Sequence, residues 1–383
     1  MKTYDIIIIG AGASGIFAAG RVKNKSVCIL DAGATPLRRV AISGGGKCNF
    51  TNMSADYKHY FGENPNFTRS ALAVWTPTDM LNWVHNHNIK TFEKSPGQYF
   101  AHDATDIINA LLKDANKTDI ILNTNVLSAT KSGNIFEIKT NTQTFFAKHL
   151  CIATGGISYT NISSGDIGYK IAKSFGHKII PPRPALCGIK TKIFDSNLSG
   201  ISTPVEITIN REKITDNMLF THWGIGGPAI YRTSVRDINN GFTINLLPNC
   251  DIENLIKTTK QSNGRRQIKT ILSQQMPEHL AEFLIGKNTK NIADWTNNEI
   301  KKLAEKMIIK MAPTEFELQK FDSAEITRGG IDTTNISSKT MESKLCQGLY
   351  FIGECLDIAG DLGGYNLHMA WATATAFAKN FEQ

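Results

Sequence analysis

The sequence lacks the features of several protein classes. No apolar run approaches the roughly 20 residues that a membrane span needs. The chain also enters a strand-like segment at once, without the charged flank, apolar core and cleavage site of a signal peptide. Proline is scarce, at 12 of 383 residues, and hydrophobic residues make up 41% of the chain. We therefore expect a globular protein of about two or three domains, without a membrane partner.

Paired cysteines are missing too. The seven cysteines are odd in number, scattered along the chain and never spaced as Cys-x-x-Cys. This usage argues against a disulfide framework and a cysteine-rich zinc site, and it predicts a cytoplasmic protein with no disulfide partner. His85 and His87 lack the spacing of metal ligands on a helix, so we expect no metal site.

The opening of the chain carries the strongest pattern. A strand-like apolar run over residues 4–9 precedes Gly10-Ala11-Gly12-Ala13-Ser14-Gly15 and a helix-compatible segment. A second apolar run ends at Asp31, 21 positions after the first glycine. A strand, a glycine-rich turn, a helix and an acidic residue in this order are typical of dinucleotide binding. The alternative is an ordinary strand–turn–helix corner.

Each residue of this pattern has a physical task. Gly10 permits the tight turn, Gly12 lets the backbone approach a pyrophosphate, and Gly15 lets the helix pack closely on the strand. The positive end of the helix then faces the phosphates, and Asp31 can accept hydrogen bonds from a ribose. We predict that this part of the chain binds a dinucleotide.

A second glycine-rich stretch indicates which dinucleotide is bound. Gly353-Glu354 follows a strand-like run, and the sequence GDLGGYN at 360–366 opens an apolar helix expected over 366–381. That helix start offers backbone N–H groups and a positive dipole to another part of the same cofactor. Because no second complete Gly-x-Gly-x-x-Gly is present, the sequence predicts FAD rather than a dedicated NAD(P)H domain.

The middle of the chain changes character twice. From about residue 190, short alternating segments such as 205–209 and 242–247 suggest a small β-barrel or sandwich. Residues 251–311 then read as all helical. Before residue 190 we expect helices over 78–86 and 104–112, and strands over 120–122, 134–140, 144–149 and 150–154.

The helical stretch is basic. Residues 257–310 hold eleven Lys and Arg against five Asp and Glu, a net +6 in 54 residues of a chain whose net charge is +8. The excess is either a solvated helical face or a patch that contacts phosphates. In the second case, Arg265, Arg266 and Lys269 are the expected contacts of an RNA substrate.

Several motifs together identify a family. They are SGGGKCNFTN (43–52), ATGG (153–156), FTHWGIGGPAI (220–230), EITRGGI (325–331), TMESK (340–344) and GLYFIGECLDIAGDLGGYNL (348–367). Over essentially its whole length the chain resembles the BaiN/RdsA family of bacterial FAD-dependent flavoproteins. The SGGGKCN and GGYNL stretches are specific to that family rather than to flavoproteins in general.

The resemblance implies an α/β fold with a discontinuous Rossmann-like FAD-binding domain, residues 1–189 and 322–383. It also implies an inserted β-barrel, residues 190–250 and 312–321, and a basic helical subdomain, residues 251–311. Members of the family resemble reductases that use FAD, with NADPH or NADH as a transient electron donor. Their activities include reduction of a steroid-like enone, oxidation of a small amine, and formation of dihydrouridine in large-subunit ribosomal RNA.

The resemblance further assigns residues to the cofactor, from its adenosine half to the flavin ring. The implied FAD-binding residues are Gly10, Gly12, Ala13, Ser14, Gly15, Asp31, Ala32, Gly44, Gly45, Gly46, Lys47, Cys48, Asn49, Val126, Thr154, Gly155, Gly156, Gly353, Glu354, Asp361, Gly363, Gly364, Tyr365 and Asn366. The chain departs from the family at Gln98, where an arginine is frequent, and at His368, where a glutamine is frequent. Both departures affect the expected substrate rather than FAD binding.

The expected chemistry is hydride transfer from reduced flavin to an electron-poor alkene carbon, while a protein acid protonates the adjacent carbon. Cys48 is the first candidate acid, because the neighbouring Lys47 is expected to lower the pKa of its thiol. The alternative is that Cys48 only packs against the ring. His368 is the second candidate, unless it is a packing histidine, and Tyr159 is the third.

Three functions stay open. The first is a reductase that converts a uridine of large-subunit ribosomal RNA to dihydrouridine, with the basic insert binding the RNA. The second is a flavin-dependent reductase or oxidase of a small molecule, and the third is a non-catalytic FAD-bound binding protein. The basic insert favours the first function, and the glycine loop with Cys48 disfavours the third.

Overall fold

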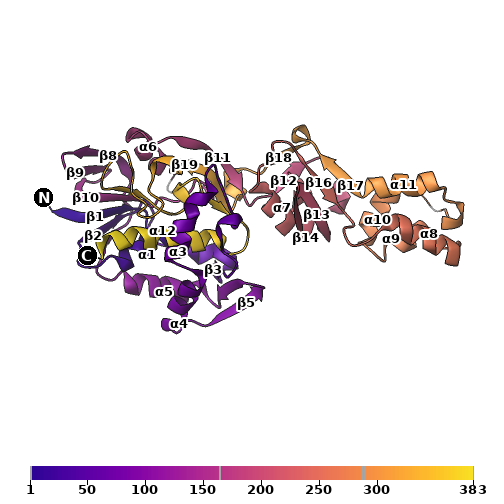
Figure 1. The fold of residues 1–383 in the computed structure, drawn as a ribbon, viewed down its shortest axis with the longest axis horizontal. Helices are drawn as coiled ribbons and strands as arrows, with labels where there is room; N and C mark the ends of the chain where they lie inside the picture. The colour runs from indigo at the N-terminus through magenta and orange to yellow at the C-terminus, as the bar shows by residue number, and fades with distance from the viewer. Residues whose placement is uncertain (1, 164, 287, 289, 383) are drawn as a thin grey trace. The chain divides into compact units, whose positions relative to one another are not determined.

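The structure, a computed structural model, describes residues 2–163, 165–286, 288 and 290–382. The chain folds into two compact units, which can be followed by colour along the chain in Figure 1. The first unit joins Met1–Pro184 to Ala324–Gln383, and the second is Ala185–Ser323. These junctions differ by a few residues from the ones the sequence suggested, after 189 and before 322.

A seven-stranded sheet forms the centre of the first unit, in the order β7-β2-β1-β10-β9-β8, with β20 also paired to β10. Strands β7, β2, β1, β10 and β20 are parallel, and β9 and β8 extend the sheet in antiparallel fashion. Ile6, Ile7 and Ile8 are fully buried, as expected of a parallel strand covered on both faces. The bounds are β1 Thr3–Ile9, β2 Val27–Leu30, β7 Asp119–Ile121, β8 Val126–Ser132, β9 Ile135–Thr140, β10 Thr144–Ile152 and β20 Leu349–Phe351.

Strand β10 connects the two segments of this unit. Its residues 144–147 pair with β9, and its residues 150–152 pair with β20 from the later segment. The two strands expected over 144–149 and 150–154 are therefore one, because no turn residue separates them. The pairing brings the residues after β20 next to the turn that follows β1.

Two helices carry the glycine-rich turns. α1 (Ala13–Arg21) packs on α12 (Tyr365–Ala378), with the rings of Phe17 and Trp371 5.1 Å apart. α12 buries side chains on all its faces, so it is a core helix. The expected helices over 78–86 and 104–112 are confirmed as α4 and α5. The other bounds are α2 Arg38–Ile42, α3 Thr68–Val74, α4 Pro77–Asn86, α5 Ala104–Asp114 and α6 Ile167–Ser174.

Three small sheets lie beside these helices. In the first, β6 (Gln98–Ala101) pairs with both β3 (Asn49–Asn52) and β5 (Thr91–Ser95). In the others, β4 (Tyr60–Phe61) pairs with β21 (Ala359–Gly360), and β11 (Ile179–Ala185) pairs with β19 (Ile326–Ile331). The β4–β21 pair holds the residues around 60 against the segment that leads into α12.

The second unit is built on one antiparallel sheet of seven strands, in the order β17-β16-β13-β14-β15-β12-β18. The sheet is barrel-like, because the ring of Phe242 on β16 lies 5.2 Å from the ring of Phe316 on β18, near the opposite edge. This agrees with the β-barrel that the sequence suggested. The bounds are β12 Ile189–Thr191, β13 Ser202–Ile209, β14 Glu212–Thr221, β15 Gly224–Gly226, α7 Pro228–Ser234, β16 Phe242–Asn245, β17 Ile308–Met311 and β18 Phe316–Leu318.

Four more helices belong to the same unit, after α7: α8 (Ile252–Ser262), α9 (Ile268–Leu272), α10 (Glu278–Ile285) and α11 (Asn297–Lys306). Ile256 and Leu280 from these helices share one hydrophobic core with Ile244 of the sheet, so the helices do not form a compact unit of their own. The all-helical expectation was wrong at residues 308–311, which form β17 and pair with β16. Lys287, counted in the basic excess, lies outside the described residues. None of the helices described here is long and apolar enough to cross a membrane.

Candidate cofactor-binding site

The turn between β1 and α1 has the geometry of a phosphate-binding turn. Gly10 has a φ of +115°, which favours glycine. A Cβ on Gly15 would overlap the carbonyl oxygen of Gly10, so α1 begins in direct contact with the turn. A Cβ on Gly12 would meet no atom within 4 Å. Gly12 thus leaves open space at the N-terminus of α1, where an anion can approach.

Asp31, which follows β2, is tied to the same turn. Its Oδ2 accepts a hydrogen bond from the Ala11 N–H and its Oδ1 accepts one from the Gly33 N–H, both at 2.7 Å. The guanidinium of Arg38 lies 3.4 Å from Oδ1. Because each carboxylate oxygen has two lone pairs, Asp31 can still accept a hydrogen bond from a ribose.

The segment before β8 runs beside Asp31. The Thr124 N–H donates to the Asp31 carbonyl at 2.9 Å, and the Asn123 N–H donates to the Gly33 carbonyl at 3.0 Å. Val126 begins β8 two residues later, and Ala32 is exposed between the two bonded residues. The structure therefore brings Val126, Asp31 and Ala32 together, as a shared adenosine site requires.

The loop over residues 43–49 is open to solvent. Gly44, Gly45 and Gly46 have φ values of +58°, +68° and +82°, a run that other residues rarely adopt. Gly44, Gly45 and Lys47 are exposed. Asn49 ends the loop, with its amide placed to donate to the Tyr99 carbonyl and to accept from the Gly364 N–H, each at 3.2 Å. The loop is thus joined to the start of α12.

The expectation for the Cys48 thiol was wrong. Cys48 has a φ of +48° and a fully buried side chain. Burial raises the pKa of its thiol to about 12, whereas we expected Lys47 to lower it. The Lys47 Nζ instead lies 5.5 Å from the centre of the Phe92 ring. The thiol is neutral at physiological pH, and a ligand cannot touch it in this conformation.

The later segment meets the first turn at Gly353. Gly353 has a φ of +72°, and a Cβ there would lie 2.5 Å from the Ser14 hydroxyl on α1. Its N–H donates to the Thr373 hydroxyl on α12 at 3.1 Å. Gly353 is therefore held between the two helices whose N-termini follow the glycine-rich turns.

The N-terminus of α12 packs against β3 and β6. Gly363 and Gly364 have φ values of +112° and +93°. A Cβ on Gly364 would lie 2.6 Å from the Thr51 carbonyl oxygen, and one on Gly363 would lie 2.7 Å from the Gln98 amide. Gln98, which replaces the arginine frequent in the family, thus lies at this helix start.

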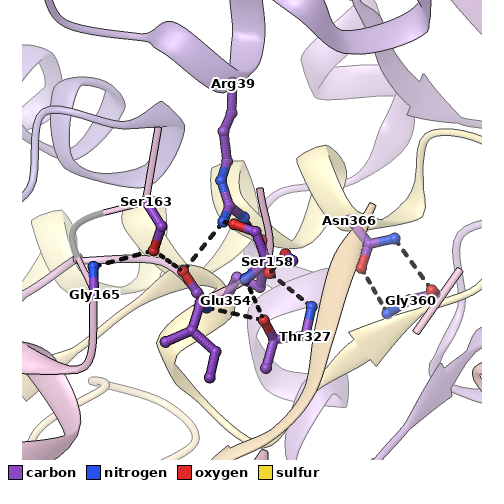
Figure 2. Close-up of polar contacts among 10 residues, drawn as sticks. Arg39, Ser158, Ser163, Gly165, Thr327, Glu354, Gly360 and Asn366 are labelled. Carbon is purple, nitrogen blue, oxygen red and sulfur yellow. Dashed lines mark hydrogen bonds and ion pairs between the residues drawn. The ribbon is translucent and has the colours of Figure 1, made fainter. Parts of the chain in front are cut away.

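Glu354 joins four segments of the first unit through a polar network (Figure 2). Its Oε2 forms an ion pair with Nη1 of Arg39 at 2.7 Å, and its Oε1 accepts from the Thr327 N–H at 2.9 Å. Arg39 also donates to the carbonyls of Gly156, at 3.1 Å, and Ser158. The side chains of Arg39 and Glu354 are 25% and 20% exposed, so the pair is buried in part but remains accessible.

Thr327 completes this network from β19. Its hydroxyl oxygen accepts from the N–H groups of Ile157 and Ser158, at 2.9 and 3.0 Å. A Cβ on Gly156 would overlap both Glu354 and Thr327. The loop after β10, which holds Thr154, Gly155 and Gly156, is therefore fixed by Arg39, Thr327 and Glu354 together.

Asn366 closes the loop that precedes α12. Its Oδ1 accepts from the Gly360 N–H at 2.7 Å, and its Nδ2 donates to the Gly360 carbonyl at 3.1 Å (Figure 2). The Asp361 N–H donates to the His59 carbonyl at 2.9 Å. The ring of Tyr365 stacks on the ring of His59, with centroids 4.8 Å apart. Asn366 and Tyr365 thus hold the backbone of this turn in place.

These segments fit an extended dinucleotide. The N-termini of α1 and α12 each follow a glycine turn and present backbone N–H groups with a positive dipole, which suits phosphates and the anionic edge of a ring. Gly12, Gly155 and Gly364 are each partly exposed, as are Glu354 and Asn366. The residues that can hold FAD therefore include accessible members of every segment.

The other two candidate acids differ in accessibility. His368 is fully buried, is hydrogen-bonded through Nδ1 to the Thr51 hydroxyl at 2.9 Å, and has a pKa that burial lowers to about 4. It is a neutral packing histidine at neutral pH. Tyr159 is partly exposed, with a φ of +52°, in the loop fixed by Arg39.

The three expected RNA contacts fall into two groups. Lys269 forms ion pairs with Glu278 at 2.7 Å and Glu282 at 2.5 Å, and hydrogen bonds to these carboxylates raise its pKa. Arg265 is exposed and Arg266 half-buried. Neither guanidinium forms an ion pair or hydrogen bond with another residue that the structure describes.

Sequence reasoning missed Arg39 and Thr327. Arg39 follows Arg38 without distinctive spacing, and its partner Glu354 lies 315 positions later in the chain. The EITRGGI motif includes Thr327, and its position within a family motif was the only signal for it. Across the described part of the chain, no group of His, Cys, Asp and Glu could hold a metal ion.

Comparison with known proteins identifies the family of this chain. Residues 4–380 match the family described as HI0933-like protein Rossmann domain. The chain is 39% identical to the ribosomal RNA dihydrouridine synthase of Haemophilus influenzae and 36% identical to that of Escherichia coli K12, each over 99% of this chain and 98% of the relative. It is 28% identical to the 3-dehydro-bile acid delta(4,6)-reductase of Clostridium scindens, over 96% of each chain.

Proposed function

Because the chain belongs to the HI0933-like family of flavoprotein oxidoreductases, we propose that it reduces a uridine of large-subunit ribosomal RNA to dihydrouridine. FAD is the resident cofactor of this proposal, and NADPH or NADH is the electron source. The observation that carries the choice of substrate is the similarity, over nearly the whole chain, to two proteins named ribosomal RNA dihydrouridine synthase.

In this proposal, different residues of the first unit bind different parts of the cofactor. We assign Asp31 and the Val126 backbone to the adenosine, and the α1 N-terminus at Gly12 to the pyrophosphate. Glu354 and the turn before α12 border the ribityl chain and the ring, and the loop over 43–49 runs along the flavin. The open space at Gly12 and the exposure of this loop support the assignment.

Reduction of uracil adds one hydride and one proton across its C5–C6 double bond. FAD, when bound and reduced, would supply the hydride, and C6 of the uracil would accept it because the C4 carbonyl makes that carbon electron-poor. The protein has to orient the uracil ring, exclude water and deliver the proton to C5. NADPH or NADH then restores the two electrons, and it docks only transiently in this proposal.

We propose Tyr159 as the proton donor. Of the three candidate acids, Cys48 and His368 have fully buried side chains, and the imidazole of His368 is neutral at neutral pH, so its remaining N–H is too weak an acid to protonate the uracil ring. Tyr159 is partly exposed in a loop whose Ser158 carbonyl accepts a hydrogen bond from Arg39. A phenol is an established general acid in enzymes.

The proposal is tested by deleting the gene in its host and measuring nucleosides of purified large-subunit ribosomal RNA by mass spectrometry. We expect one dihydrouridine to disappear and to return with the intact gene. Gly12→Asp is expected not to restore it, because a carboxylate would occupy the phosphate position. The control is Gly133→Asp in the turn between β8 and β9, where a Cβ also meets nothing within 4 Å and where aspartate is one of the few residues that adopt the observed φ of +56°. Tyr159→Phe is expected to keep FAD bound while restoring little dihydrouridine.

An unchanged profile of ribosomal RNA nucleosides in the deletion strain would contradict the proposal. The second candidate function is then reduction of a small-molecule enone, which the similarity to the bile acid reductase favours. It is tested by following NADPH oxidation by the purified flavoprotein with a steroid enone.

A further inference from the structure

We propose that the second unit contacts RNA phosphates through a basic surface formed by Arg265, Arg266, Lys301 and Lys302, and that Lys269 takes no part in this contact. We call these four residues the α8–α11 basic surface. The inference rests on the proposed function and identifies the part of the second unit that meets the substrate.

Five of the described cations of the helical part are already engaged. Lys257 pairs with Glu253 at 3.2 Å, Lys290 with Glu299 at 2.9 Å, and Lys269 with two glutamates. The ammonium groups of Lys260 and Lys306 donate to the carbonyls of Trp295 and Leu284, at 2.6 and 3.1 Å. An ammonium that is held by a carboxylate or carbonyl must break that contact before it binds a phosphate.

The four residues of the α8–α11 basic surface have no such contacts. Their side chains form no ion pair or hydrogen bond with any residue of the described ranges. Arg265, Lys301 and Lys302 are exposed and Arg266 is half-buried. On α11 the neighbours Ile300 and Leu303 are buried, so the two lysines lie on the solvent side of the helix.

Backbone hydrogen bonds place the two arginines near the start of α11. The Gly264 carbonyl accepts from the Ala293 N–H at 2.9 Å, and the Arg266 carbonyl accepts from the Ile292 N–H at 2.8 Å. α11 begins shortly afterwards, at Asn297, and packs against α8, beside which it lies in Figure 1. Lys310 is also exposed, but it lies on β17 and is left out of the surface.

The chemistry of this surface suits a polyanion with regularly spaced phosphates. Guanidinium groups bind phosphate oxygens with two parallel N–H donors, and two adjacent arginines on one turn can meet neighbouring phosphates. Asp294 and Glu305 are exposed acids of the same region without an ion pair to another described residue, so the four cations outnumber them two to one. Single-stranded and duplex RNA both provide the complementary charge.

The test compares matched variants of the FAD-loaded protein. The probe is protein-free large-subunit ribosomal RNA from the deletion strain, and its affinity is measured over a range of KCl concentrations. The variants are Arg265→Ala with Arg266→Ala, and Lys301→Ala with Lys302→Ala; the control is Lys269→Ala. Melting temperature and flavin absorbance confirm that each variant is folded and loaded.

Loss of two phosphate contacts should make the negative slope of log K against log salt shallower by about 1.4–1.8. Binding should weaken about 25- to 60-fold at 0.1 M salt. Lys269→Ala should leave the slope unchanged and alter the affinity less than about threefold, since its charge is already neutralised by carboxylates. A Lys269 effect as large as that of the arginine pair would overturn the proposed surface.

The outcomes also separate this inference from the proposed function. If the arginine and lysine variants bind and reduce the RNA as the wild type does, the surface is wrong and the proposed function stands. If the wild type itself neither binds the RNA in a salt-dependent way nor forms dihydrouridine, both are wrong.

Discussion

Replacing Gly12 and Gly15 with alanine, one at a time, separates the two tasks that the first glycine-rich turn performs. Both glycines lie within the same helix start, and both substitutions add one methyl group. At Gly12 the added Cβ meets no atom within 4 Å, whereas at Gly15 it overlaps the Gly10 carbonyl. The first variant should therefore harm cofactor binding alone, and the second should harm the fold.

The magnitudes follow from these surroundings. Gly12 has a φ of −83° and a ψ of −169°, which alanine adopts freely. Alanine restricts the unfolded chain more than glycine does, which stabilises the fold by about 0.4–1 kcal/mol. This gain is offset because alanine caps the N-terminus of α1 less well than glycine. The free energy of unfolding without cofactor should thus change by less than about 1 kcal/mol. If the methyl group enters the phosphate position, overpacking of about 1–3 kcal/mol weakens FAD binding roughly 5- to 160-fold.

Gly15→Ala should behave in the opposite way. Its Cβ would lie more than 1 Å inside ordinary contact with a backbone oxygen, which has no side-chain freedom to move aside. Overpacking of this kind costs about 1–3 kcal/mol in the cofactor-free protein, or roughly 2–12 °C in melting temperature for a unit of this size.

The assays are urea unfolding of the cofactor-free protein and titration of FAD followed by quenching of its fluorescence. The reasoning is refuted if Gly12→Ala binds FAD as tightly as the wild type, because the open space at Gly12 would then not be the phosphate position. It is equally refuted if Gly15→Ala without cofactor unfolds at the wild-type urea concentration.

Two further predictions concern polar residues of the first unit. Arg39→Ala should lower the free energy of unfolding by about 1–3 kcal/mol, because it leaves the partly buried Glu354 without its ion pair. The free energy of unfolding of Arg39→Lys should lie between those of Arg39→Ala and the wild type, because lysine keeps the charge but lacks the planar guanidinium. If Arg39→Ala unfolds at the same urea concentration as the wild type, the network does not stabilise the fold. His368→Gln should make the free energy of unfolding depend less on pH between 7 and 4. Burial lowers the pKa of His368 to about 4 in the folded protein, so as pH falls from 6.5 to 4 the unfolded chain binds a proton before the folded protein does. In the wild type this lowers the free energy of unfolding by about 3 kcal/mol at pH 4. Parallel stability curves of the two proteins between pH 7 and 4 would show that His368 is not the group responsible.

The glycines of the first turn were predictable because their signal is local. Gly10, Gly12 and Gly15 follow a strand at fixed spacing, and the covalent geometry of a strand–turn–helix unit leaves few alternatives. Strands β1, β2 and β9 and helices α4 and α5 were predictable for the same reason, since periodicity and turn residues act over a few positions. At residues 308–311 this local reasoning failed, because pairing with the distant β16 makes a strand of a segment that follows a helix.

The residues around the candidate flavin site were harder to predict because their contacts are distant in the chain. The chemistry of Lys47 suggested a reactive neighbour, but the left-handed backbone at Cys48 accompanies a buried thiol, and burial outweighs the adjacent charge. Arg39 could not be paired with Glu354 from the sequence, since no local pattern connects them. Lys269 and Arg265 look alike in the sequence, and only the positions of Glu278 and Glu282 distinguish them.

The pairing of β10 with β20 has a consequence for how the protein is made. Six of the seven strands of the sheet, with the turn at Gly12, leave the ribosome before the second unit does, whereas β20, Glu354 and α12 follow after it. The second unit is continuous in the chain and has its own core, so it can complete folding while the sheet still lacks a strand and its core helix. During that interval Ser14 lacks its contact with Gly353, and Arg39 lacks its carboxylate. In the cofactor assignment that we propose, the nascent protein becomes competent to take up FAD only after Ala324 and the residues beyond it have been synthesised, which makes cofactor loading a late event of biosynthesis.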